Sequence, residues 1–322
     1  MQVGQTKKIE KVVVLGTGGT IAGTAASSSE QVAYTAAQLG VAQLTAALPG
    51  LDKVLDGRQL VLEQVAQLDS KDMDHATWQL LARRCAHWLA QADVGALVIT
   101  HGTDTIEETA WFLQSVLQPS KPVVMVCAMR PASSDEADGP QNLLDAFAVS
   151  AQTLAAGVSV VCAGVIHSAR DVQKVHPYRL DAFSSGEGGP LGYVEQGRVR
   201  WSTPGSMPEP HPHARQALAL PATGWPWVEV LHNHAGADAR QVRALVAAGV
   251  NGLVVAGTGN GTVHQSLLTA LAEAQAQGVA VRLTTRCAEG QIVGQPAALP
   301  TAPLGLNAYK ARVSLMLDLM TA

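Results

Sequence analysis

KVVVLGTGGTIAGT, residues 11–24, is the segment from which the architecture of the chain can be worked out. Its apolar run at 12–15 is too short for a helix, is rich in β-branched residues and stops at Gly16, which is typical of a fully buried parallel strand. The glycines that follow let the backbone turn tightly and approach a ligand closely. Because open α/β sheets bind ligands at the carboxyl ends of their strands, we expect a functional loop here.

The glycine-rich loop at 16–24 has three interpretations. Spacing disfavours a dinucleotide site, because with Gly16 and Gly18 as the first two glycines of the fingerprint the third position falls on Ile21. The acidic residue expected about twenty positions later would fall near 36–38, where the sequence has none. A threonine nucleophile and a plain strand-to-helix turn without chemistry both stay open on this loop alone.

The composition is typical of a soluble, well-buried α/β enzyme-like chain rather than a disordered one, since 47% of the 322 residues are hydrophobic and 15% are charged. A net charge of −4 gives no electrostatic footprint for nucleic acid, and no apolar run is long enough to span a bilayer. The N-terminal segment leads straight into the first strand and does not read as a signal peptide. Cys85, Cys127, Cys162 and Cys287 form no CxxC pair, so we expect buried free thiols and a cytoplasmic location.

Strand and helix patterns alternate over the first half of the chain. Expected strands cover 12–15, 60–65, 96–100, 122–128 and 158–165; expected helices cover 35–48, 74–91 and 141–155, and one more begins at a capping box of Thr105 and Glu108. Such alternation implies parallel strands joined by right-handed crossovers. The loops 16–24, 68–72 and 101–105 therefore share one edge of the sheet, and they carry hydroxyl and acidic side chains.

The pattern changes after residue 167. Residues 167–194 favour irregular chain and a hairpin, and the proline-rich stretch 202–226 indicates a linker. A smaller α/β unit follows, with strands at 227–231, 252–256 and 279–283 and helices at 238–248, 263–277 and 308–320. The sequence predicts an α/β fold with a larger N-terminal domain over 1–201, whose mainly parallel sheet is flanked by helices, and a smaller C-terminal α/β domain over 227–322.

A second loop with chemistry, HGTDT, follows a buried strand, so we expect Thr103 and Asp104 to face the same cleft as Thr20. In a purely structural interpretation Asp104 caps the next helix and both threonines are turn residues. That interpretation does not explain why two threonine loops, an acid and a tyrosine converge. Threonine is a weak nucleophile that needs a proton acceptor, for which Tyr34, Asp104 and, in its neutral form, Lys174 are available.

Two long motifs, GTGGTIAG at 16–23 and ITHGTDTIEETAWFL at 99–113, resemble the signature motifs of the bacterial L-asparaginase family. Further similar segments are KPVVMVCAMRP at 121–131, ADGPQNLLDA at 137–146, RDVQK at 170–174, GPLGY at 189–193 and AGTGNG at 256–261. The resemblance covers nearly the whole chain. It implies a double-displacement amidohydrolase that converts L-asparagine to L-aspartate and ammonia through a threonine ester, without a metal or an organic cofactor.

The resemblance also implies roles for matching positions. Thr20 matches the nucleophile, Tyr34 the tyrosine of a flexible lid at about 24–34, and Thr103, Asp104 and Lys174 the second catalytic cluster. Ser70 matches the residue that holds the substrate α-carboxylate, Asp104 the one that holds the α-ammonium, and Ala128 a position whose backbone contacts the amide. The implied assembly is a homotetramer, a dimer of dimers in which a second subunit completes each site, with no nucleic-acid or membrane partner.

Departures from the family pattern leave the choice between L-asparagine and L-glutamine open. Lys71 stands where known periplasmic members place glutamine or glutamate near the α-ammonium, which a cation repels unless its side chain turns away. Thr262 stands where some members place an asparagine of the neighbouring subunit, and Asn260 aligns with the asparagine before it. The segment 291–305 is shorter than its counterpart.

The sequence leaves three rival functions open. They are a dual glutaminase-asparaginase, a subunit of an amidotransferase that acts on charged tRNA, and a catalytically silent amino-acid-binding protein. The tRNA-dependent function requires an extra N-terminal domain and a basic surface, neither of which the sequence shows. A silent binder has no need for two threonine loops, so the intact pattern argues against it.

Overall fold

The computed structural model describes residues 10–152, 155–202, 218–294 and 299–320. The chain forms two compact units, Met1–Glu209 and Pro210–Ala322, each with its own sheet. Most of the predicted linker, residues 203–217, lies outside the described residues, and its described end contains the 3-10 helix η5 (Ala222–Gly224). The domain limits at residues 201 and 227 stay a prediction.

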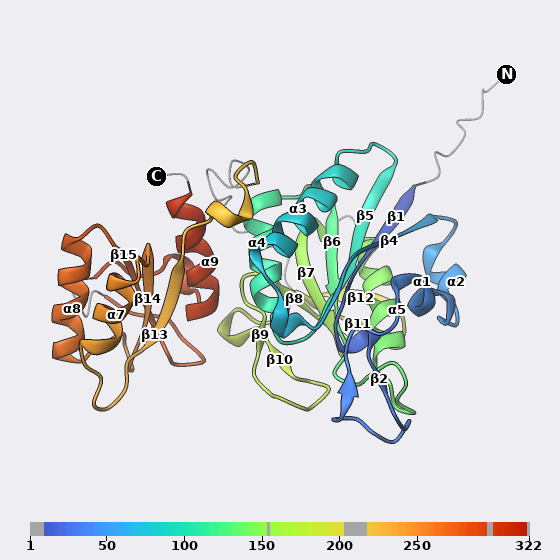
Figure 1. The fold of residues 1–322 in the computed structure, drawn as a ribbon. Coiled ribbons are helices and arrows are strands. Elements are labelled where there is room, and N and C mark those ends of the chain that lie inside the picture. The colour runs from blue at the N-terminus through green and yellow to red at the C-terminus, as the bar shows by residue number, and fades with distance from the viewer. Residues whose placement is uncertain (1–9, 153–154, 203–217, 295–298, 321–322) are drawn as a thin grey trace. The chain divides into compact units, whose positions relative to one another are not determined.

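An eight-stranded sheet forms the centre of the first unit, in the order β12-β11-β8-β7-β6-β5-β1-β4 (Figure 1). The strands are β1 (Lys11–Gly18), β4 (Gln59–Leu68), β5 (Val94–Thr100), β6 (Pro122–Val126), β7 (Gly157–Cys162), β8 (Val165–Ser168), β11 (Gly192–Glu195) and β12 (Arg198–Trp201). Neighbours from β4 to β7 are parallel, whereas β8, β11 and β12 extend the sheet antiparallel. The predicted mainly parallel sheet is confirmed.

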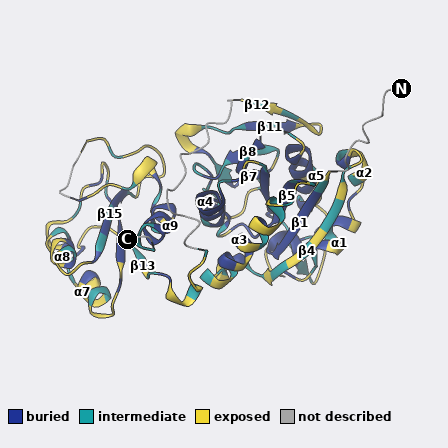
Figure 2. Cartoon of the chain, turned by 90° about the horizontal axis from the view of Figure 1, so that it is seen from above, coloured by how far each residue is buried: buried dark blue, intermediate teal, exposed yellow. Residues whose placement is uncertain are grey.

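Helices cover both faces of this sheet. Val12 and Val14 share a core cluster with Phe147 of α5 (Gly139–Ser150). Side chains alternate along a strand, so the equally buried Val13 and Leu15 face the other side, where α3 (His75–Leu89) and α4 (Ile106–Leu117) pack together. Figure 2 shows the resulting buried centre. None of the described helices is long and apolar enough to cross a membrane.

The helix expected at 35–48 is wrong in its first half. Tyr34 and Thr35 form the short strand β3, which pairs antiparallel with β2 (Thr24–Ala25), and this pairing keeps the chain out of a helix. The helix α1 (Val41–Ala46) begins only after Gly40, and α2 (Leu51–Leu55) follows it.

Two further expectations needed correction. The strand expected at 158–165 is the pair β7 and β8, because Ala163 and Gly164 have positive φ angles of 50° and 74° and reverse the chain. The capping box at Thr105 is absent, because the Thr105 hydroxyl donates to the carbonyl oxygen of Ser70 at 2.8 Å instead. That hydrogen bond joins two loops rather than closing the helix end.

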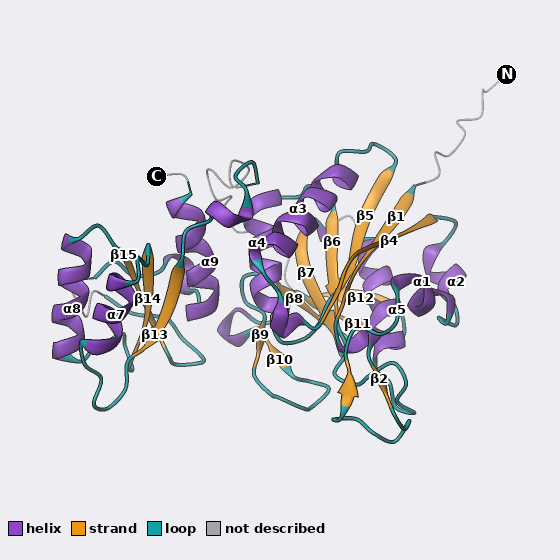
Figure 3. Cartoon of the chain, viewed as in Figure 1, coloured by secondary structure: helices purple, strands orange, loops and turns teal. Residues whose placement is uncertain are grey.

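The second unit holds a three-stranded parallel sheet, in the order β13-β14-β15 (Figure 3). Its elements are β13 (Val228–His232), β14 (Gly252–Gly257), β15 (Ala280–Thr285), α7 (Arg240–Ala247), α8 (Gln265–Ala276) and α9 (Ala308–Leu319). α9 contacts all three strands. The predicted smaller α/β part of the fold is confirmed.

The cysteines divide into two groups. Cys85, Cys127 and Cys162 are buried free thiols, as predicted. Cys287 is also free but exposed, so the expectation of burial is wrong for it. It lies just beyond the end of β15, where the chain leaves the core.

Candidate active site

The loops that follow β1, β4 and β5 pack against one another through backbone. Gly19 has a φ of 83°, and a Cβ on it would lie 2.3 Å from the Cα of Gly102. A Cβ on Gly102 would lie 2.5 Å from the Oγ of Ser70. The backbone N–H of Gly19 donates to the carbonyl of Leu68 at 2.9 Å, and that of Asp104 donates to the Ser70 Oγ at 3.1 Å. The three loops therefore share one edge of the sheet, as predicted, and only glycine fits where they touch.

Thr20 and Tyr34 form a hydroxyl pair on the first of these loops. Their oxygens lie 2.7 Å apart, and Thr20 is buried at the start of the 3-10 helix η1 (Thr20–Ala22). The β2–β3 pairing, with Ala25 opposite Tyr34, brings the phenol back over Thr20. Burial raises the pKa of Tyr34, the hydrogen bond with Thr20 lowers it, and the charges of Asp69 and Asp104 raise it further.

Lys174, Thr103 and Asp104 form a second cluster. The Lys174 Nζ donates to the Thr103 Oγ1 at 2.8 Å and to the Asp104 Oδ1 at 2.6 Å. Lys174 lies in β9 (Gln173–Lys174), which pairs with β10 (Phe183–Ser184) in otherwise irregular chain. The Thr103 hydroxyl lies 3.4 Å from the same Asp104 oxygen. The second oxygen of Asp104 has no hydrogen-bond partner within the described residues, which leaves it open to a ligand.

Glu107 is a residue that the sequence reasoning missed. It lies in the first turn of α4, where an acid is expected to do no more than favour the helix dipole. The residue is only 8% exposed, and its Oε2 accepts the backbone N–H of Lys174 at 3.0 Å. The only feature of the sequence that could have pointed to a role for Glu107 in the site is its position three residues after Asp104. A favourable interaction with the helix dipole explains an acid at that position equally well.

Ser70 and Ala128, the expected substrate-binding residues, are both buried. Ser70 supports the neighbouring loop, since its Oγ accepts the N–H of Asp104 and its carbonyl accepts the Thr105 hydroxyl. Ala128 follows the end of β6, and the next two N–H groups, of Met129 and Arg130, donate to the carboxylate of Asp138. Both residues thus belong to loops held rigidly at the sheet edge.

The lid segment 24–34 is docked on the chain that follows Ala128. The N–H of Ala132 donates to the carbonyl of Gly23 at 2.9 Å, and Ser28 bonds to Asp135 through both side chain and backbone. The Gln31 amide bridges two segments, donating to Glu136 at 3.1 Å and accepting from the Tyr178 hydroxyl at 2.7 Å. These contacts hold Tyr34 in place beside Thr20.

Comparison with known proteins agrees with this architecture. Residues 11–206 match the family model for the asparaginase N-terminal domain, and residues 227–321 match that for the glutaminase/asparaginase C-terminal domain. The chain belongs to the asparaginase family. The glutaminase-asparaginase of Pseudomonas fluorescens biotype A is 36% identical over 97% of this chain and 87% of its own length. L-asparaginase 2 of Escherichia coli strain K12 is 37% identical, over 98% of this chain and 90% of its own.

A solved asparaginase structure has the same fold. The crystal structure of a probable cytoplasmic L-asparaginase from Campylobacter jejuni superposes with a TM-score of 0.89 at 34% sequence identity. The match covers 97% of this chain and 96% of the other. The resemblance to the asparaginase family that the two motifs predicted is confirmed.

In this member of the asparaginase family, the two divergent residues Lys71 and Thr262 and the matching Asn260 all contact neighbouring residues of this chain. Lys71 is exposed, pairs with Asp72 and lies 3.7 Å from a carboxylate oxygen of Asp69. The hydrogen bond to Asp72 raises the pKa of Lys71. Asn260 exchanges two hydrogen bonds with the backbone of Val293, at 2.9 and 2.7 Å, and the Thr262 hydroxyl lies 2.9 Å from that of Thr258.

Proposed function

We propose that the chain is an amidohydrolase that converts L-asparagine to L-aspartate and ammonia through an ester on Thr20. The observation that carries the proposal is the hydroxyl pair of Thr20 and Tyr34, 2.7 Å apart, on the loop that packs against the one bearing Thr103 and Asp104. Membership of the asparaginase family supports the amide substrate, and the relatives named L-asparaginase support L-asparagine.

In the first half of the reaction the Thr20 oxygen attacks the side-chain amide carbon of the substrate. The Tyr34 phenol is protonated at neutral pH, because the pKa of a tyrosine is ordinarily about 10 and burial raises that of Tyr34. A protonated phenol accepts the Thr20 proton only while it passes its own proton on, and the amide nitrogen receives that proton. The C–N bond then breaks, ammonia leaves and the acyl group stays on Thr20.

In the second half water attacks the ester carbon, the Thr20 oxygen takes back a proton and aspartate leaves. Lys174 orients the Thr103 hydroxyl toward this step, and the open oxygen of Asp104 receives the substrate α-ammonium. Ser70 donates its hydroxyl proton to the α-carboxylate, and the backbone at Ala128 contacts the amide. N–H groups of the glycine-rich loops stabilise the oxyanion in both halves.

A dual glutaminase-asparaginase is the second candidate. Relatives with that name, from Pseudomonas fluorescens biotype A and Pseudomonas aeruginosa, are 36% and 34% identical, against 37% for the Escherichia coli L-asparaginase 2. These identities do not separate the two activities. The ratio of kcat/KM for L-asparagine to that for L-glutamine decides between them.

We also propose a homotetramer, a dimer of dimers, located in the cytoplasm. The family resemblance supports the assembly. The absence of disulfides among the four cysteines and the Campylobacter jejuni neighbour, described as probably cytoplasmic, support the location, although a Haemophilus influenzae relative is described as periplasmic. Light scattering on the purified protein tests the assembly, and cell fractionation tests the location.

Ammonia release by the wild type and by Thr20→Ala, each with L-asparagine and with L-glutamine, tests the proposed activity. We expect release from the wild type and none from Thr20→Ala, with mass spectrometry showing the acyl adduct on Thr20 during turnover. A folded wild type that binds L-asparagine but releases no ammonia would overturn the hydrolase proposal in favour of a silent binding protein.

A further inference from the structure

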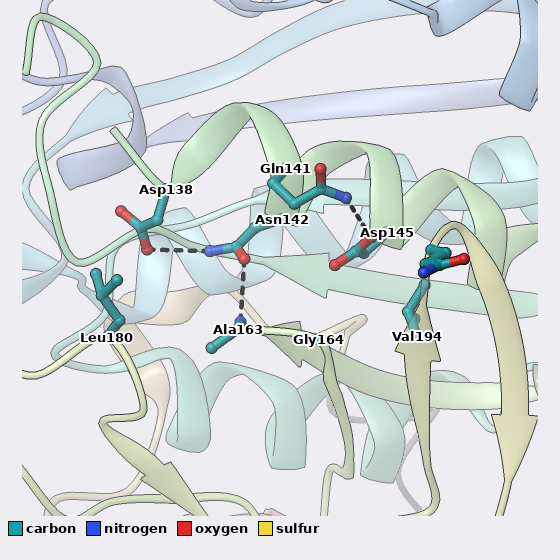
Figure 4. Close-up of a pocket in the computed structure, with 9 residues that line it drawn as sticks. Asp138, Gln141, Asn142, Asp145, Ala163, Gly164, Leu180 and Val194 are labelled. Atoms are coloured by element: carbon teal, nitrogen blue, oxygen red, sulfur yellow. Dashed lines mark hydrogen bonds between the residues drawn. The ribbon is translucent and has the colours of Figure 1, made fainter. Parts of the chain in front are cut away.

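A pocket of about 400 Å³ opens between α5 and the turn at 163–164 that joins β7 to β8 (Figure 4). None of the residues proposed for hydrolysis lines it. Its polar lining consists of two carboxylates and three amide side chains, from Asp138, Asp145, Gln141, Asn142 and Gln196. Its lining contains no lysine, arginine or histidine, so the pocket is anionic and has no cation of its own.

Asp145 is the distinctive group of this pocket. The residue is 3% exposed, and one carboxylate oxygen accepts the Gln141 amide at 2.8 Å. Its other oxygen has no hydrogen-bond partner within the described residues, and the carboxylate points into the pocket (Figure 4). Burial raises the pKa of Asp145 to about 6, against the weaker opposing effect of Gln141. At neutral pH this carboxylate is therefore buried with no counter-charge among the described residues that line the pocket, an arrangement that costs free energy unless a cation joins it.

Asp138, the other acid, is already satisfied. Its two oxygens accept the N–H of Met129 at 3.0 Å, the N–H of Arg130 at 2.9 Å and the Asn142 amide at 3.1 Å. Asn142 is fixed in turn, because its carbonyl oxygen accepts the N–H of Ala163 at 3.0 Å. The open anionic acceptor of the pocket is therefore Asp145 alone.

We propose that this pocket binds a small ammonium-type cation, NH4⁺ or a short R–NH3⁺, with the open oxygen of Asp145 as its anionic partner. Amide oxygens in the wall supply further acceptors for the remaining N–H groups. A zwitterionic amino acid is disfavoured, because its own carboxylate would meet two acids and no cation. A metal ion is disfavoured too, because the described residues contain no cluster of three or more histidine, cysteine or acidic ligands.

Ammonium, which the proposed hydrolysis releases, belongs to this ligand class. That link rests on the proposed function, whereas the site itself does not. The Thr20→Ala protein, which lacks the proposed nucleophile, is therefore expected to bind the cation as the wild type does. A failure of binding and a failure of hydrolysis are thereby distinguished.

The test follows the Tm of the wild type in methylammonium chloride at pH 8, with KCl at equal ionic strength as the reference. A ligand that binds only the folded state raises Tm in a saturable way. We expect a saturable rise beyond that in KCl, which Asp145→Asn abolishes while Asp52→Asn, a change at an exposed acid in α2, keeps it. Tetramethylammonium, which has no N–H to donate, is expected to give no rise beyond KCl.

The pH dependence gives a further check. At pH 5 Asp145 holds a proton, and Asp138 is the only other titratable group in the lining, so the methylammonium effect is expected to fall several-fold. Equal Tm shifts in methylammonium and KCl would overturn the proposal, because they would show a general salt effect. An undiminished shift in Asp145→Asn would overturn it as well.

Discussion

The backbone N–H of Lys174 donates a hydrogen bond to the Oε2 of Glu107, with 3.0 Å between nitrogen and oxygen. Lys174 lies in a two-residue strand within irregular chain, whereas Glu107 lies in the helix that directly follows Thr103 and Asp104. The ammonium of Lys174 binds those two residues, so this backbone contact fixes the lysine at its other end. Glu107 is thus a positioning residue for the second cluster.

Glu107→Ala is therefore expected to lower kcat for L-asparagine by about tenfold or more, since hydrogen bonds to charged groups contribute about 1.5–3 kcal/mol. Glu107→Gln keeps an acceptor oxygen and is expected to stay within a few-fold of the wild type. Glu108→Ala, in the same helical turn, removes an equivalent dipole contribution and serves as the control. Equal kinetics for the alanine and glutamine variants of Glu107 would contradict the positioning role.

Tyr34→Phe isolates the phenolic hydroxyl. The ring keeps its packing against Gly23, where an added Cβ would lie 2.9 Å from the Tyr34 Cδ2, but Thr20 loses its 2.7 Å partner. General acid–base catalysis contributes about 10²–10⁴-fold, so kcat is expected to fall within that range while KM changes little. Steady-state kinetics measure this, and an unchanged kcat would remove Tyr34 from the proton transfer.

Gly102→Ala tests the backbone packing at the sheet edge. The new Cβ would lie 2.5 and 2.7 Å from the Oγ and Cβ of Ser70, which is buried and cannot move aside. Overpacking of this kind costs about 1–3 kcal/mol, and we expect the free energy of unfolding and the activity both to fall. Gly224→Ala is the matched control, because a Cβ there meets nothing within 4 Å. Urea unfolding of the two variants gives the comparison.

Asp145→Asn is expected to stabilise the protein at neutral pH. The folded-state pKa of about 6 lies above the ordinary value of 3.8, so the folded protein binds the proton more tightly than the unfolded chain does. The contribution of Asp145 is therefore most favourable at low pH and is lost as pH rises from about 4 through about 6. Thermal melts should show the variant a few degrees above the wild type at pH 8 and level with it at pH 4.

Tyr178→Phe tests the docking of the lid. The variant loses only the hydroxyl that donates to Gln31 at 2.7 Å. A partly exposed hydrogen bond contributes about 0.5–1.5 kcal/mol, so we expect kcat/KM to fall by about two- to tenfold. Tyr309→Phe, an exposed tyrosine of the second unit, should leave kcat/KM unchanged. A Tyr178→Phe enzyme with unchanged kcat/KM would show that this contact does not limit closure.

Much of the fold followed from local pattern. The apolar runs at 12–15 and 96–100 are strands because they are buried on both faces, and parallel pairing then brings Thr20, Ser70 and Thr103 to one edge. The predicted start of the first helix, at residue 35, was wrong because the tertiary contact between Tyr34 and Thr20, rather than local propensity, determines the backbone conformation there. No periodicity signals such a contact.

The residues of the two clusters differed in how well their positions could be predicted from the sequence. Thr103 and Asp104 follow a recognisable strand, so the strand topology alone predicted that they lie at the same sheet edge as Thr20. Tyr34 and Lys174 lie in two-residue strands that the sequence did not predict, so residue chemistry named them only as candidate proton acceptors and the family resemblance gave them their positions in the site. Neither strand topology nor the family resemblance pointed to Glu107 and Asp145, because an acid on a helix is ordinary in a sequence and only the structure shows that these two are buried.

The uneven burial of the four sulfur atoms has a practical consequence. Cys85, Cys127 and Cys162 lie inside the first unit, whereas Cys287 is open to solvent on the second. A maleimide applied to the native protein should therefore label one sulfur per chain. A fluorophore or a solid support can be attached at Cys287, in the unit that does not carry Thr20, without first mutating the other cysteines away.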